Sequence, residues 1–87
     1  MNDRINNVVE KIHDRDEFIY QLSKATGISL STIISHWIKR SKFIIPEKYL
    51  ETGYEVSVKT LQDQEERIKK HEDYIRNLEV TFEEVKP

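Results

Sequence analysis

Side chains that can bind nucleic acid are concentrated between residues 29 and 42 of this chain. Residues with hydroxyl or imidazole groups come first, and three basic residues follow. The candidate contact residues are Ser29, Ser31, Thr32, Ser35, His36, Lys39, Arg40 and Lys42. Hydroxyl and imidazole groups can hydrogen-bond base edges in the major groove, whereas lysine and arginine contact phosphates. This order of residue types indicates double-stranded DNA as a partner.

The distribution of charge favours the same segment. The 87-residue chain has a formal net charge of −2, which argues against a general polyanion binder. Residues 18–46 nevertheless hold four bases and no acid, while residues 54–87 hold six bases and nine acids. Because salt screens distant charges, the potential that a phosphate meets at contact range is set locally. The acid-free segment is therefore the expected DNA face.

Other kinds of chemistry find little support in the sequence. There is no cysteine, so neither disulfides nor thiolate metal sites are expected. His13 and His71 have no companions at metal-ligand spacing, and the pair formed by His71 and Asp73 is a weak one. No nucleophile, base and orienting group occur in a recognisable pattern. We expect no enzymatic activity, no metal and no cofactor.

Nothing in the sequence indicates a membrane segment. Apolar runs are short, the longest being Phe43–Ile45. The polar start, Met1–Arg4, is unlike a signal peptide. A cytoplasmic protein is the expectation.

Two amphipathic helices are predicted before the candidate contact residues. The first covers residues 3–12 with Asp3 as its cap, and the second covers residues 17–25 with Asp16 as its cap. Gly27 stands where the end of a helix needs a left-handed residue. The inward-facing residues are Ile5, Val8, Val9 and Ile12 in the first helix and Phe18, Ile19, Leu22 and Ala25 in the second.

Two further helices are predicted up to residue 53. The third is capped by Ser29 or Ser31 and runs to about Ser41. The fourth begins at Pro46, a residue suited to the first helical position, and ends before Gly53. Expected inward residues are Ile34, Trp37 and Ile38 in the third helix, completed by Leu30 or Ile33, and Tyr49 and Leu50 in the fourth.

The C-terminal part has the pattern of one long helix over residues 58–79. Four acid-before-base pairs at i, i+4 spacing support it. Apolar residues recur at intervals of seven, which allows a coiled coil, although Gln64 and His71 interrupt the seam. The candidate oligomerisation residues are Leu61, Ile68, Ile75, Leu78 and Phe82. The alternative is that the helix folds back onto its own domain, using Leu61 and Ile68 only.

The run Gly27–Trp37, followed by Lys39-Arg40 and later by Ile45-Pro46, resembles the Cro and phage-repressor type of DNA-binding domain. Residues 16–61 carry the resemblance. It implies a helix-turn-helix DNA-binding domain. Together with the helix pattern, it predicts an all-α fold, with a domain of four to five helices over residues 1–56 and the C-terminal oligomerisation helix and tail over residues 57–87.

This chain departs from the family pattern at two places. It has one residue more between Gly27 and Trp37, so either the turn is longer or Ile33 or Ile34 is displaced outward. Ser23 stands where the family usually has alanine, which brings a hydroxyl to the close approach of the two helices.

The expected function is a sequence-specific DNA-binding transcription regulator, a repressor or activator of phage or mobile-element type. It would act as a homo-oligomer, either a dimer or a tetramer, with RNA polymerase or another regulator as a further partner. The alternative is a protein-interaction module, such as an antirepressor, modulator or antitoxin-like protein, which binds another regulator rather than DNA.

Overall fold

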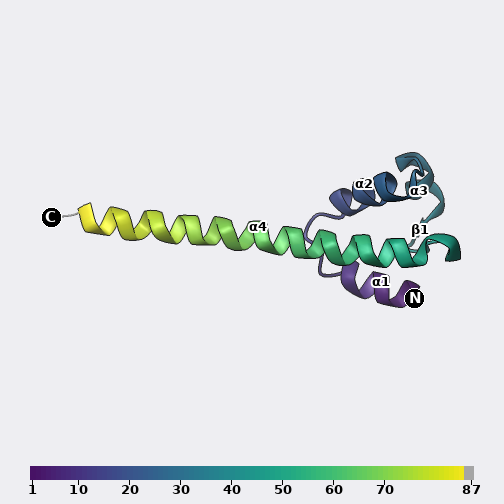
Figure 1. The fold of residues 1–87 in the computed structure, drawn as a ribbon, viewed down its shortest axis with the longest axis horizontal. Helices are drawn as coiled ribbons and strands as arrows, with labels where there is room; N and C mark the ends of the chain where they lie inside the picture. The colour runs from purple at the N-terminus through teal and green to yellow at the C-terminus, as the bar shows by residue number, and fades with distance from the viewer. Residues whose placement is uncertain (86–87) are drawn as a thin grey trace.

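The computed structural model describes residues 1–85, with side chains through His71. Its elements are α1 (Asn2–Val9), α2 (Arg15–Thr26), α3 (Leu30–His36), β1 (Ile38–Lys39), β2 (Lys42–Phe43), the 3-10 helix η1 (Glu47–Tyr49) and α4 (Leu50–Val85). In Figure 1, α1 and α2 lie along the first half of α4, and the second half extends away from them. The chain is thus mostly helical and ends in a long helix, as predicted. The short hairpin of β1 and β2 was not predicted.

One apolar core joins the helices to the hairpin. Its buried members are Ile5, Val9, Ile12, Phe18, Ile19, Leu22, Ile33, Trp37, Phe43 and Ile45. The rings of Phe18 and Phe43 meet edge to face with their centroids 5.0 Å apart, which ties α2 to β2. Burial of each such side chain contributes about 1.5–3 kcal/mol before the entropy of ordering is counted. Ala25 was predicted to face inward but is exposed.

Both predicted N-terminal caps of the first two helices are wrong. Helix α1 begins at Asn2, so Asp3 lies within its first turn rather than at its cap. Helix α2 begins two residues earlier than expected, and the side chain of Asp14 caps it by accepting hydrogen bonds from the amides of Asp16 and Glu17. Asp16 instead places its charge in the first turn, where the helix dipole favours it.

The predicted break at Gly53 is also wrong, because α4 continues through it from Leu50. A Cβ atom on Gly53 would lie only 2.8 Å from Cδ1 of the buried Ile45. The glycine therefore allows the segment after the hairpin to pack against the helix. Within the described residues, no helix is long and apolar enough to cross a membrane.

Candidate nucleic-acid interface

A left-handed glycine makes the turn between α2 and α3, as predicted. Gly27 has φ 75°, and its amide donates to the carbonyl of Ser23 at 2.9 Å. The hydroxyl of Ser23, which replaces the expected alanine, donates to the carbonyl of Ile28 at 2.5 Å. It thereby satisfies a carbonyl that the sharp turn removes from helical bonding.

Apolar side chains clamp the two helices from within. Leu22 of α2 and Ile33 of α3 are fully buried, and the ring of Trp37 packs 5.4 Å from the ring of Tyr49. Ile34, which was predicted to face inward, is instead 56% exposed. The extra residue before Trp37 is thus accommodated with Ile33 inward and Ile34 outward.

Polar residues form the outer face of α3. Ser29 is the N-cap, and its Oγ accepts from the amide of Thr32 at 3.3 Å and donates to the hydroxyl of Thr32 at 2.8 Å. These two hydroxyls therefore stabilise the start of the helix. Ser31, Ser35 and His36 are exposed on the following turns. They are the side chains of α3 best placed to meet a ligand in solvent.

Helix α3 is shorter than predicted, and the three bases lie on the hairpin that follows it. The helix ends at His36, and the carbonyl of Trp37 accepts from the amide of Ile44 at 2.6 Å. Lys39 pairs with Lys42 across the hairpin. Arg40 forms the tight turn together with Ser41, both with positive φ. The hairpin places the exposed Lys39, Arg40 and Lys42 at one tip.

Arg15 adds a fourth cation at this tip, which sequence reasoning missed. Its Nη1 donates to the carbonyl of Ser41 at 3.1 Å, although the two residues are 26 positions apart. The sequence carries no signal for this contact, since it depends on how the start of α2 meets the hairpin.

Asn2 and Asn6 of α1 hold the hairpin in place, a role that was not predicted from the sequence. The Asn6 amide accepts from the amide of Phe43 at 2.8 Å and donates to its carbonyl at 2.9 Å. Asn2 makes the same pair of bonds with Ile45, at 2.9 and 3.3 Å. Two side chains at i, i+4 on the helix thus pair with two residues at i, i+2, of which Phe43 ends β2 and Ile45 follows it. They satisfy an edge that another strand would otherwise cover.

A shallow depression lies between α1 and the hairpin. It is lined by Asn2, Asp3, Asn6, Lys39, Arg40, Lys42, Phe43 and Ile44. Asp3 brings an acidic group to this otherwise basic surface, and it comes from outside the acid-free segment. The hairpin therefore has a net positive charge that one neighbouring carboxylate partly offsets.

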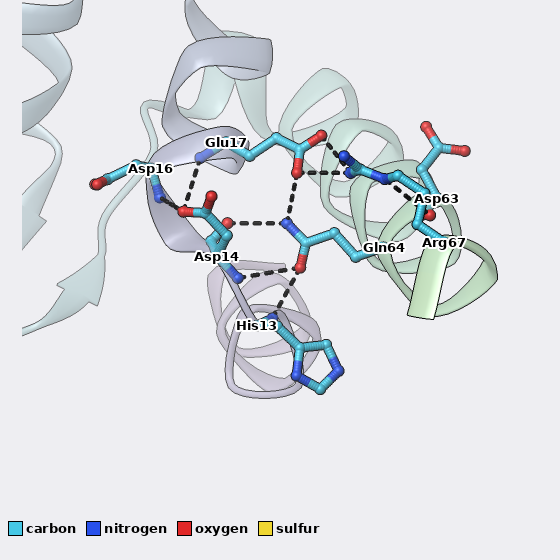
Figure 2. A network of polar contacts seen from close by, with 7 residues as sticks. All are labelled: His13, Asp14, Asp16, Glu17, Asp63, Gln64 and Arg67. Carbon is cyan, nitrogen blue, oxygen red and sulfur yellow. Dashed lines mark hydrogen bonds and ion pairs between the residues drawn. The ribbon is translucent and has the colours of Figure 1, made fainter. Parts of the chain in front are cut away.

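A second polar cluster, shown in Figure 2, joins α4 to the loop between α1 and α2. Gln64 is only 5% exposed. Its Oε1 accepts from the amides of His13 and Asp14 at 2.9 and 3.1 Å, and its Nε2 donates to the carbonyl of Asp14 and the carboxylate of Glu17. No buried polar side-chain atom in the described part of the chain lacks a hydrogen-bond partner. The buried polar groups of this cluster therefore find their partners within the fold.

Glu17 in that cluster is neutralised by α4. Its two carboxylate oxygens lie 2.6 and 2.7 Å from Nη2 of Arg67. The hydrogen bonds from Arg67 and then from Gln64 hold the pKa of Glu17 below its ordinary value, against a smaller effect of desolvation. The same contact raises the pKa of Arg67. Glu17, the last acidic residue before the acid-free segment, is thus already paired with a basic side chain.

The predicted oligomerisation residues are differently placed. Leu61 packs against the core of its own domain, as the fold-back alternative expects, while Ile68 is 38% exposed. The side chains of Ile75, Leu78 and Phe82 lie outside the described residues. Gln64, which occupies the seam position between Leu61 and Ile68, is buried within its own domain.

Within the described residues, no three His, Asp or Glu side chains are grouped so that they could hold a metal ion. Comparisons of the chain with protein-family models, with curated proteins and with solved structures found no match.

Proposed function

We propose that this chain is a sequence-specific DNA-binding transcription regulator of the helix-turn-helix kind, of phage or mobile-element type. One observation carries the proposal. The exposed polar face of α3, with Ser31, Ser35 and His36, is followed directly by a hairpin whose tip holds Lys39, Arg40 and Lys42. A polar helix can hydrogen-bond base edges in the major groove, and the basic side chains that follow it can contact phosphates.

The division of labour follows from the two elements. Helix α3 enters the major groove, where hydroxyl and imidazole groups hydrogen-bond base edges. Arg15 and the three basic side chains of the hairpin contact phosphates, and these contacts fix the orientation of the domain on the duplex. Asn2 and Asn6 hold the hairpin in a fixed position relative to the helices, so the phosphate contacts set where α3 lies in the groove.

We further propose that the chain acts as a homo-oligomer through the second half of α4. This helix has 36 residues and is therefore about 54 Å long, which is more than its own domain can cover. Heptad spacing continues from Ile68 through Ile75 and Phe82 in the sequence. Two linked domains would bind two half-sites with an affinity that one domain could not reach.

The test of DNA binding uses the full chain and duplexes that flank its own gene, measured by gel shift and fluorescence anisotropy. A dimer that neutralises about eight phosphates should lose about 10⁴-fold in affinity between about 50 and 200 mM salt. The double variant Lys39→Glu with Arg40→Glu should lose at least about 100-fold at low salt. Its matched control is Lys69→Glu with Lys70→Glu, which changes the charge equally on α4 and should bind nearly as well as the original chain. Full binding by the hairpin variant would contradict the proposal.

The test of self-association is sedimentation of the full chain at micromolar concentration. An oligomer is expected, and Ile75→Asp with Leu78→Asp should convert it to a monomer. Asn77→Asp, which adds an acid at a position off the heptad seam, serves as the control. A full chain that sediments as a monomer would exclude α4 as the subunit contact.

A protein-interaction module is the second candidate. The observation that favours it is the excess of acids in residues 54–87, nine against six bases, along the helix that leaves the domain. Such a surface repels DNA and can dock a basic protein. Weak and sequence-independent binding to every duplex, together with tight binding to another regulator, would favour this candidate.

A further inference from the structure

Ile34 is an exposed aliphatic side chain on α3, a helix whose outward residues are mostly polar. It lies next to the fully buried Ile33 and is 56% exposed, and Leu30, one turn earlier, is 43% exposed. Ile44, after the hairpin, is also exposed at 49%, but it does not lie on α3. Ile34 and Leu30 form an apolar margin on α3.

This margin is continuous with the face that the proposed function assigns to DNA. Successive residues of an α-helix are about 100° apart. Ile34 therefore lies about 60° from Ser31 around the axis, while Thr32 and His36 lie on the opposite side of Ser35. The outward face of α3 thus has hydroxyl groups in the middle, an apolar margin on one side and a polar margin on the other.

Among the four bases, only thymine presents a methyl group in the major groove, and apolar side chains contact it there. We propose that Ile34, supported by Leu30, reads thymine through its C5-methyl group. The inference rests on the proposed function and deepens it, because it names the base that the apolar margin selects. Serine hydroxyls can bond to several bases, so the isoleucine supplies a discrimination that they lack.

Two observations favour DNA over a second copy of the chain as the occupant of this margin. The margin lies within the acid-free residues 18–46, close in sequence to Lys39, Arg40 and Lys42, so its surroundings complement a polyanion. Two partly exposed side chains also offer far less apolar area than the roughly 800 Å² per partner that stable protein interfaces bury.

The test begins with selection of bound duplexes from a random pool by the full chain. Each thymine of the selected site is then replaced singly by deoxyuridine, which removes the methyl group and keeps every hydrogen-bonding group. At least one thymine per half-site should weaken binding about three- to fourfold, the value of one buried methyl group. In Ile34→Ala the same replacement should have almost no effect. Ile44→Ala, which truncates an exposed isoleucine of the hairpin, should keep the full effect.

Three outcomes would overturn the inference. Selected duplexes that tolerate uracil at every position would leave DNA binding intact but exclude methyl readout. A uracil effect that persists in Ile34→Ala would assign the methyl contact to another side chain. Loss of self-association by Ile34→Ala in sedimentation would assign the margin to a second copy. Failure to select any duplex would instead contradict the proposed function itself.

Discussion

The two polar regions of this protein use similar side chains in opposite ways. Around Gln64, amide, carboxylate and guanidinium groups meet backbone groups of the loop between α1 and α2 and bond to one another. On α3 and the hairpin, serine, histidine and basic side chains point into solvent. The polar groups of the first region bond to one another within the fold, while those of the second remain exposed to solvent.

This difference separates polar groups that stabilise from polar groups that bind. A buried amide with its bonds made contributes to folding because its removal leaves donors and acceptors unpaired. An exposed base contributes almost nothing to folding, and surface ion pairs are worth little. Variants in the first region should therefore change stability and leave DNA affinity alone, and variants at the hairpin tip should do the reverse.

The largest effect on stability is expected from Gln64→Leu. The substitution unpairs the amides of His13 and Asp14 and the carbonyl of Asp14 beneath α4. The free energy of unfolding should fall by about 2–4 kcal/mol, measured by urea denaturation. Gln62→Leu, at an exposed position of the same helix, should change it little. A Gln64→Leu variant as stable as the original chain would show that this cluster does not hold α4.

Asn6→Ala should have the next largest effect, and it sharpens the comparison because Asn6 combines a feature of each region. It is a satisfied polar group, yet it holds the hairpin that carries the bases. We expect a loss of about 2 kcal/mol in stability, faster hydrogen exchange at the amide of Phe43 and weaker DNA binding. The exposed neighbour Asn7→Ala should change none of these. Unaltered DNA binding by Asn6→Ala would mean that the hairpin needs no such support.

Local patterns in the sequence predicted much of the helical framework. Apolar spacing located α1, α2 and α4, and Gly27 and Ser29 marked the turn and the cap of α3. These features depend on neighbouring residues alone, so their signals are contained in short windows. Trp37 was likewise predicted to face inward, and it is buried.

The features that shape the candidate site depend on contacts distant in sequence. Nothing near Lys39 marks the end of α3, because the strands are two residues long and the turn uses Arg40 and Ser41 rather than glycine. The hairpin is held instead by Asn2 and Asn6, which lie 37 or more positions away. The predicted helix end at Gly53 was wrong for a related reason, since this glycine allows close packing against Ile45 and does not terminate a helix.

Lys42→Ala should leave stability within about 0.5 kcal/mol of the original value, because its side chain is exposed at the hairpin tip. Its effect should appear in DNA binding, with about fivefold lower affinity at low salt and a salt slope reduced by about 1 per subunit. Lys11→Ala, at an exposed position after α1, is the matched control and should keep the slope. An unchanged slope for Lys42→Ala would remove this residue from the phosphate contacts.

The smallest effect is expected from removing the charge of Glu17. It tests how far the stability provided by the Gln64 cluster depends on ionisation. Because the pKa of Glu17 is lowered in the folded state, its ion pair with Arg67 stabilises the protein above the unfolded-state pKa, and this stabilisation is lost as the pH falls through the folded value. Glu17→Gln keeps an acceptor for the Gln64 amide but removes the charge. The variant should therefore melt slightly below the original chain at about pH 7, and the difference should be smaller at about pH 4, where the unfolded-state carboxyl is largely protonated. Since Arg67 is mostly exposed, we expect the difference at pH 7 to be smaller than that of Asn6→Ala. An equal difference at both pH values would mean that Glu17 acts through its hydrogen bond to Gln64 and not through its charge.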